Sequence, residues 1–121
     1  MEEKSLGIKL VNQGYDLWMN NSRGNRYSRD HQTLDVDTDL KKYFDFSFSE
    51  LGEYDQIGLW EYVMKVTGAE KISYIGHSQG TTQMFATLCD NHEFFKNKLK
   101  IFIAIAPVVS VINMDSKFLQ E

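Results

Sequence analysis

The sequence predicts an α/β fold in which parallel strands alternate with helices, and three observations support that prediction. Residues 71–75 have the apolar pattern of a buried strand, and the residues after them place apolar side chains at helical spacing. Residues 101–106 form an uninterrupted apolar run before Pro107, which suits a central parallel strand covered on both faces. Helix-length segments separate the predicted strands, and right-handed crossovers of this kind give a parallel sheet.

The N-terminal part of the chain contains a predicted helix, a predicted strand and two predicted connections. Residues 5–13 have the apolar spacing of the last turns of a helix, and Gly14 supplies the stop signal. Residues 15–19 are predicted to form a strand, and residues 20–29 a polar loop rich in Asn, Ser, Gly and Arg. Residues 31–45 have no clean period, so we expect a long connection over the surface.

Two groups of charged residues in these connections are predicted to be structural. Arg23 and Arg26 are expected to anchor carboxylates or carbonyl groups of the protein and not to touch a substrate. Asp35, Asp37 and Asp39 stand at alternate positions, as in a calcium loop, but the glycine and later glutamate of an EF-hand are not at the required offsets. We therefore expect a solvated acidic loop and no metal site.

A long helix is predicted after these connections. Ser47 and Glu50 have the spacing of a capping box, which begins a helix, and Gly68 ends it. The stripe between these two ends has helical spacing and comprises Leu51, Tyr54, Ile57, Gly58, Leu59, Tyr62, Val63 and Val66. Further along the chain, Phe94 and Phe95 are predicted to lie in a short helix or turn before the strand at 101–106.

A Gly-x-Ser-x-Gly pattern lies between the strand at 71–75 and a helix expected from Thr81 to about Asp90; its residues are Gly76, His77, Ser78, Gln79 and Gly80. In that context the pattern predicts a nucleophile elbow. Ser78 would stand exposed at the carboxyl end of the sheet, with the backbone N–H of Gln79 directed to where an oxyanion forms. The alternative is an ordinary strand-to-helix turn that carries no chemistry.

Glycine is predicted to be needed at both ends of this pattern. A side chain at Gly76 or Gly80 would obstruct the tight turn or the close approach of helix to strand, and only glycine lacks the Cβ. The neighbouring His77 is not expected to be the base, because adjacent residues at a strand end point to opposite faces. Its imidazole should therefore be directed away from the Ser78 hydroxyl.

Composition excludes several classes of protein. The 121 residues allow one domain at most, and a net charge of −4 without basic clusters argues against nucleic acid as a partner. No run approaches the roughly 18 apolar residues of a membrane span, and no signal-peptide core follows Met1 in these residues. The single cysteine, Cys89, excludes an internal disulfide and is predicted to be a buried apolar residue on the helix after Ser78. No cofactor is predicted.

Several longer motifs, distributed from about Leu6 to Val111, resemble the acid lipases, which are the gastric and lysosomal triacylglycerol and cholesteryl ester lipases of the α/β-hydrolase fold. The Asn-Ser-Arg-Gly-Asn loop together with Gly-His-Ser-Gln-Gly-Thr-Thr is much more specific than the elbow alone. The matching motifs are Gly14-Tyr15-Asp16-Leu17-Trp18, Asn21-Ser22-Arg23-Gly24-Asn25, Tyr27-Ser28, Phe46-Ser47-Phe48, Glu50, Tyr54-Asp55, Gly76 to Thr82 and Ala104-Ile105-Ala106-Pro107-Val108.

The resemblance implies a serine ester hydrolase that acts on neutral lipid esters, triacylglycerol or sterol ester, at a lipid interface. Ser78 would be the nucleophile that accepts the acyl group, and the Gln79 N–H one oxyanion donor. Secretion or lysosomal residence is implied likewise. The sequence departs from the family at Asn20, Lys42 and Ile57, where glycine, an acidic residue and proline are usual. None of these three positions belongs to the elbow.

Other parts of the family pattern are not expected within residues 1–121. The triad order in this fold is Ser, then Asp or Glu, then His. After Ser78 the candidates are Asp90, His92 and Asp115, of which the first two stand about one helix length from the serine. We also do not expect the lid-bearing cap here, or the earlier strand that lies between the strands at 15–19 and 71–75 in the sheet of this fold. We therefore expect a partial α/β-hydrolase fold, the central part of one domain that is incomplete at both ends and inactive alone.

Two other functions fit the same residues. The chain could be a truncated product without hydrolase activity, which serves as a lipid-binding or interaction module. Alternatively, the enzyme could act on a thioester or on another carboxylic ester, because the pocket walls that decide the acyl donor would lie mostly in the cap.

Overall fold

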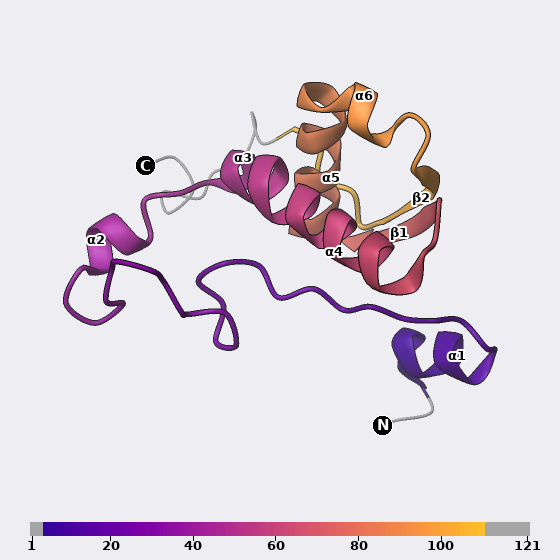
Figure 1. The fold of residues 1–121 in the computed structure, drawn as a ribbon, viewed down its shortest axis with the longest axis horizontal. Coiled ribbons are helices and arrows are strands. Elements are labelled where there is room, and N and C mark those ends of the chain that lie inside the picture. The colour runs from indigo at the N-terminus through magenta and orange to yellow at the C-terminus, as the bar shows by residue number, and fades with distance from the viewer. Residues whose placement is uncertain (1–3, 111–121) are drawn as a thin grey trace.

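A computed structural model describes residues 4–110 of the chain. Figure 1 shows that the N-terminal segment follows a long, largely irregular path, whereas the segment from α3 onward folds into helices packed beside a small sheet. The N-terminal path contains α1 (Leu6–Asn12) and the short helix α2 (Leu40–Tyr43). Helix α1 confirms the helix predicted for residues 5–13, while α2 interrupts the connection predicted for 31–45.

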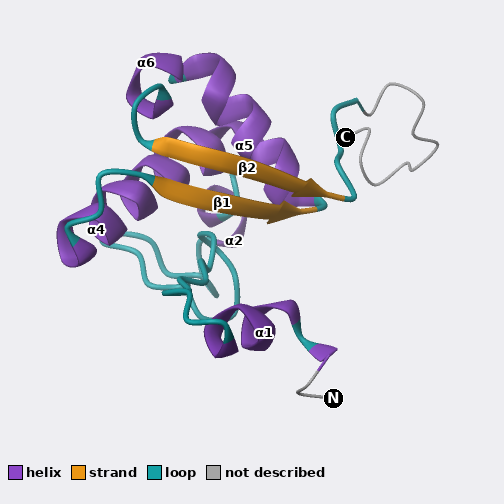
Figure 2. Cartoon of the chain, turned by 90° about the vertical axis from the view of Figure 1, so that its right-hand side faces the viewer, coloured by secondary structure: helices purple, strands orange, loops and turns teal. Residues whose placement is uncertain are grey.

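The sheet consists, in the described residues, of two parallel strands, β1 (Ile72–His77) and β2 (Leu99–Ile105). Their register pairs Ser73 with Ile101 and His77 with Ile105. The crossover between them contains α5 (Gln79–Asp90) and α6 (His92–Phe95), and Figure 2 shows both strands side by side and pointing the same way. The parallel strands, the crossover and the short helix at Phe94 and Phe95 agree with the sequence prediction.

The long helix predicted after residue 47 is present as three consecutive segments. These are α3 (Phe48–Glu50), the π-helical turn η2 (Leu51–Gln56) and α4 (Ile57–Thr67). The capping box is formed, because the Ser47 N–H donates to Glu50 at 2.7 Å and the Ser47 hydroxyl accepts from the Ser49 N–H at 3.2 Å. At the other end Gly68 adopts a left-handed conformation, with φ of 70°, as a helix-ending glycine does.

The apolar core lies between α4, α5 and α6. Trp60, Met84 and Phe95 are each at most 2% exposed, and the Trp60 and Phe95 rings meet edge to face with centroids 4.9 Å apart. Tyr74 and Phe102, from the two strands, pack against this cluster. The helices therefore cover one side of the sheet and fix the position at which β1 meets α5.

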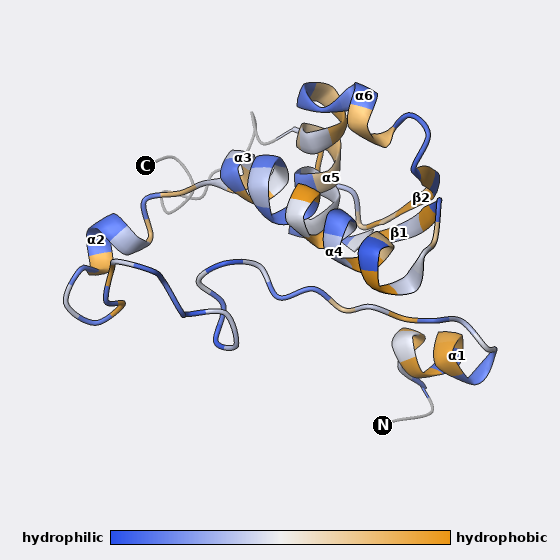
Figure 3. Cartoon of the chain, in the orientation of Figure 1, coloured by the Kyte–Doolittle hydropathy of each residue, from blue (hydrophilic) through white to orange (hydrophobic). Residues whose placement is uncertain are grey.

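The strand predicted for residues 15–19 is not formed. These residues have no strand conformation, and the described part of the chain offers them no ladder partner. A strand exists only when its N–H and C=O groups pair with those of a neighbouring strand. Figure 3 also shows apolar residues on helix α1, yet none of the residues of this helix is buried.

The predicted burial of Cys89 is wrong, because its side chain is exposed. The buried face of α5 carries Thr81, Gln83, Met84 and Thr87, and it packs against η2. Cys89 follows Met84 by five residues and is therefore rotated about 140° from it around the helix axis. None of the helices in the described range has both the length and the apolar content that crossing a bilayer requires.

Candidate active site

Ser78 occupies the single residue between β1 and α5, and its backbone is strained. Its φ of 51° and ψ of −118° lie outside the regions that a residue with a side chain ordinarily adopts. Such a conformation costs about 1–3 kcal/mol and persists only where the surrounding structure enforces it. The sharp strand-to-helix turn predicted from the sequence is present, and the Ser78 residue at its apex is exposed.

Three hydrogen bonds hold the Ser78 backbone in this conformation. Its N–H donates to the carbonyl of Ile105 at the end of β2, at 3.0 Å. Its carbonyl accepts from the N–H of Thr81 at 2.8 Å and from the hydroxyl of Thr81 at 2.6 Å. The neighbouring strand and the first turn of α5 therefore both fix the serine.

The two glycines of the elbow have different roles. A Cβ built on Gly76 would lie 2.9 Å from both the carbon and the oxygen of the Gly80 carbonyl. These are backbone atoms, so a side chain at Gly76 would force β1 and α5 apart. A Cβ on Gly80 would meet nothing closer than the Tyr74 hydroxyl at 3.7 Å, which is ordinary contact. The predicted obstruction thus applies to Gly76 and not to Gly80.

Gln79 is the first residue of α5, where backbone N–H groups have no acceptor within the helix. Its N–H therefore stands at the positive end of the helix dipole, directly after Ser78. His77 ends β1 and is exposed, and no hydrogen bond joins its imidazole to the Ser78 hydroxyl in the described residues. The arrangement places the exposed Ser78 directly before a backbone N–H at the start of a helix.

The described part of the chain supplies no base for Ser78. Its hydroxyl makes no hydrogen bond there. Asp90 ends α5, about 16 Å along the helix axis from Gln79, and His92 lies beyond it beside Glu93, with 3.4 Å between Nδ1 and the carboxylate. Both are thus as remote as the sequence predicted. The third candidate, Asp115, lies outside the described residues.

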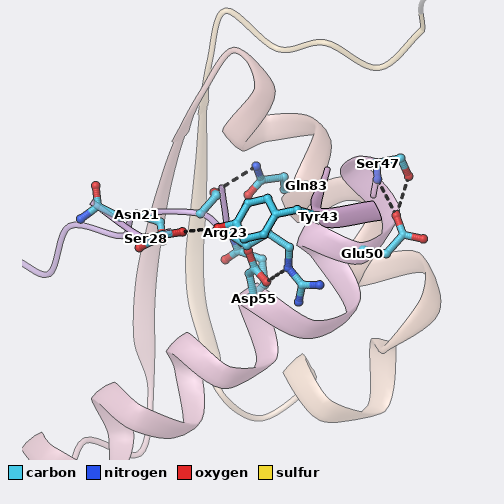
Figure 4. A network of polar contacts seen from close by, with 10 residues as sticks. Asn21, Arg23, Ser28, Tyr43, Ser47, Glu50, Asp55 and Gln83 are labelled. Atoms are coloured by element: carbon cyan, nitrogen blue, oxygen red, sulfur yellow. Dashed lines mark hydrogen bonds and ion pairs between the residues drawn. The ribbon is translucent and has the colours of Figure 1, made fainter. Parts of the chain in front are cut away.

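The loop at residues 20–29 is fastened to η2 by an ion pair. Asp55 accepts from the Arg23 backbone N–H at 2.8 Å and from the Arg23 Nε at 2.6 Å, as Figure 4 shows. This confirms the predicted anchoring role of Arg23, although the sequence did not identify Asp55 as its partner. Gly24 beside it has φ of 76°, and a Cβ there would lie 2.8 Å from the Phe44 ring. Arg26 is exposed and has no partner in the described range.

A cavity of about 430 Å³ lies next to this ion pair and not at Ser78. Its walls are formed by Arg23, Asp55 and residues of the connection between 24 and 50, among them His31 and Tyr43. The His31 Nδ1 accepts from the N–H groups of Thr33 and Leu34 at 3.1 and 3.0 Å. No cluster of three His, Cys, Asp or Glu residues suited to a metal ion is found between residues 4 and 110.

A buried polar network, which the sequence analysis missed, connects η2 to the elbow. The Gln56 amide donates to Gln83 at 3.0 Å and to the Tyr74 hydroxyl at 3.3 Å, and Tyr74 donates to the Gly80 carbonyl at 3.1 Å. Burial raises the pKa of the Tyr74 hydroxyl, an effect that the Gln56 hydrogen bond partly offsets. Tyr74 is therefore protonated at neutral pH and able to donate to the first turn of α5.

Comparison with known proteins gives a family match over almost the whole chain. Residues 2–121 match the family model described as the alpha/beta hydrolase fold. The chain is 43% identical over 111 residues to the lysosomal acid lipase/cholesteryl ester hydrolase of Macaca fascicularis, which covers 92% of this chain and 27% of that protein. It is 45% identical over 105 residues to Lipase 1 of Drosophila melanogaster, covering 87% of the chain and 23% of that protein.

A human relative matches over a still longer part of the chain. Lipase member J of Homo sapiens is 41% identical over 120 residues, which is 99% of this chain and 32% of the relative. The chain thus spans about a quarter to a third of the length of these curated relatives.

Proposed function

Because this chain belongs to the alpha/beta hydrolase fold family, we propose that it carries the nucleophile of a serine ester hydrolase of the acid lipase type. The predicted fold class and the resemblance to the acid lipases are confirmed by the family match and by the relatives. The reaction, its residues and its substrate are what we propose.

The observation that carries the proposal is the strained, exposed Ser78 between β1 and α5. In the proposed reaction the Ser78 oxygen attacks the carbonyl carbon of an ester and loses its proton to a base. The carbonyl oxygen becomes an oxyanion, which the Gln79 N–H stabilises. The C–O bond to the alcohol then breaks, the alcohol leaves with a proton, and water hydrolyses the acyl-serine.

We infer that the base and its acidic partner come from residues beyond those described. A serine hydroxyl is a weak nucleophile until a base within about 3 Å accepts its proton, and residues 4–110 place no such group at Ser78. In this proposal residues 1–121 are the central part of one α/β-hydrolase domain. A second donor to the oxyanion and the walls of the acyl pocket would come from the same flanking residues.

The proposed substrate is a neutral lipid ester, either a triacylglycerol or a sterol ester, taken from a lipid interface. Support comes from the relatives, which are named lipase and lysosomal acid lipase/cholesteryl ester hydrolase. Residence in the lysosome or secretion is proposed on the same ground. A thioester or a different carboxylic ester is the nearest alternative acyl donor.

A second candidate function is a protein without hydrolase activity that binds lipid or a partner. It is favoured by one observation, the absence of a base for Ser78 in the described part of the chain. The two candidates differ in whether Ser78 reacts covalently with an activated phosphonate.

The test is labelling by a fluorophosphonate of the protein expressed with whatever residues flank the chain in its reading frame. Labelling should be present in the natural sequence and lost in Ser78→Ala. The matched control is Ser73→Ala, which removes another exposed serine from β1 and should leave labelling unchanged. Protein that has not been treated with the fluorophosphonate is then assayed with triolein, cholesteryl oleate and a long-chain thioester. Absence of labelling, or labelling that survives Ser78→Ala, would sink the enzyme proposal and favour the non-catalytic one.

A further inference from the structure

The hydroxyl of Thr81 is fully buried and connects three parts of the elbow. Thr81 has 0% exposure, and its Oγ1 donates to the Ser78 carbonyl at 2.6 Å. The same oxygen accepts from the N–H of Val108, in the segment after β2, at 3.0 Å. The hydroxyl therefore uses its donor and one acceptor position, both for backbone groups at the carboxyl end of the sheet.

These contacts determine how one particular peptide unit is oriented. The Ser78 carbonyl and the Gln79 N–H belong to the same planar, trans peptide unit and point in opposite directions. Two donors from Thr81, its hydroxyl and its N–H, hold that carbonyl toward the first turn of α5. The Gln79 N–H on the other edge of the plane is thereby turned outward, away from the helix.

We propose that Thr81 is a positioning residue that aims the Gln79 N–H at the oxyanion through the rigid Ser78–Gln79 peptide unit. This inference rests on the proposed function, because it concerns the oxyanion donor of that reaction. The strain at Ser78 strengthens it: a residue at φ of 51° has no intrinsic preference for its conformation, so its peptide orientation is set by the groups that bind it.

Thr81 also ties the elbow to the segment that follows β2. Val108 is held from two sides, because its N–H donates to Thr81 and its carbonyl accepts from the Thr82 hydroxyl at 3.0 Å. Ala106 in this segment has φ of 49°, a second strained residue next to the elbow. The segment thus bonds directly to the Thr81 hydroxyl and limits its rotation away from Ser78.

The chain contains a matched control for the loss of this hydroxyl. Thr87 lies on the same helix, is 1% exposed, and also donates its hydroxyl to a backbone carbonyl, that of Gly52. It lies nearly two turns further along α5, and neither of its described hydrogen bonds involves the elbow. Replacing either threonine by valine removes a buried hydroxyl at nearly constant volume, but only one of the two replacements affects the peptide unit at Ser78.

The experiment measures kcat and KM on p-nitrophenyl butyrate, and thermal midpoints, for the protein expressed with its flanking residues. Loss of one oxyanion donor costs about 10²–10³ in kcat in other serine hydrolases, so misdirecting it in Thr81→Val should lower kcat about tenfold or more. KM should stay within about twofold, because the oxyanion exists only in the transition state. Thr81→Ser should restore kcat, and Thr87→Val should lower the thermal midpoint with kcat unchanged.

If Thr81→Val does not fold, the pair Thr81→Ser and Thr81→Cys replaces it, since the thiol is a weak donor in the same position. Serine should then exceed cysteine in kcat about tenfold at equal KM. The inference is overturned if kcat is unaffected, or if Thr81→Val and Thr87→Val reduce it equally. In either case the proposed function would still stand if the natural sequence hydrolyses the ester and Ser78→Ala does not. A natural sequence that neither hydrolyses esters nor reacts with fluorophosphonate would overturn both.

Discussion

The substitution Gly76→Ala separates the two elbow glycines, which the sequence pattern treats as equivalent. The added Cβ would lie 2.9 Å from two atoms of the Gly80 carbonyl and 3.0 Å from the Thr81 nitrogen. Carbon atoms pack favourably at about 3.5–4.0 Å, so α5 would have to move by more than 0.5 Å, roughly, from β1. Because all three obstructing atoms are backbone, no side-chain rotation relieves the clash.

The expected loss of unfolding free energy for Gly76→Ala is about 3 kcal/mol. Overpacking of a rigid site costs about 1–3 kcal/mol, and the movement of α5 also weakens a hydrogen bond at Ser78, worth about 0.5–1.5 kcal/mol. By contrast, Gly80→Ala should be neutral or slightly stabilising, since its Cβ would have 3.7 Å of clearance from Tyr74 and alanine favours the helix.

The assay is urea unfolding followed by far-UV circular dichroism and by the fluorescence of the buried Trp60. Gly58→Ala is the matched control, because a Cβ there meets nothing within 4 Å on an exposed helical position. It should stabilise the protein by about 0.5–1 kcal/mol through helix propensity. Equal stability of Gly76→Ala and Gly80→Ala would refute the close approach of β1 and α5 described above.

Three further predictions concern the anchored loop and the helix cap. Arg23→Lys should lower the unfolding free energy by about 1 kcal/mol, because it removes the hydrogen bond from Nε to Asp55. The loss is small because the charge and the backbone hydrogen bond remain and the ion pair is partly exposed. An unchanged urea midpoint would contradict this. Ser47→Ala should cost about 1 kcal/mol of helix capping in the same assay. Hydrogen bonds from the Ser47 N–H and, to a smaller extent, from the Ser47 hydroxyl lower the pKa of Glu50 below its ordinary 4.5. The stabilisation by this carboxylate is therefore present above pH 4.5 and is lost as the pH falls through the lowered pKa of the folded state. In Glu50→Gln this acid-dependent part of the stability profile should be absent.

Local patterns in the sequence determined the elements and the elbow. The period of apolar residues identified β1, β2 and α5, and the capping box and Gly68 identified the ends of the long helix. These features depend on residues only a few positions apart, because side-chain direction repeats every two residues in a strand and every 3.6 in a helix. Ser78 was placed at the strand-to-helix turn for the same reason.

Tertiary structure decided which groups meet across long separations of the chain. Arg23 and Asp55 are 32 residues apart, and the Gln56 and Gln83 side chains 27 residues apart, so no periodic pattern connects either pair. The lack of a strand ladder at residues 15–19 in the described range, and the exposure of Cys89, likewise depend on what does or does not pack against them. The Thr81 hydroxyl is the clearest case: its residue type is visible in the sequence, but its position between Ser78 and Val108 exists only once β2 lies beside β1.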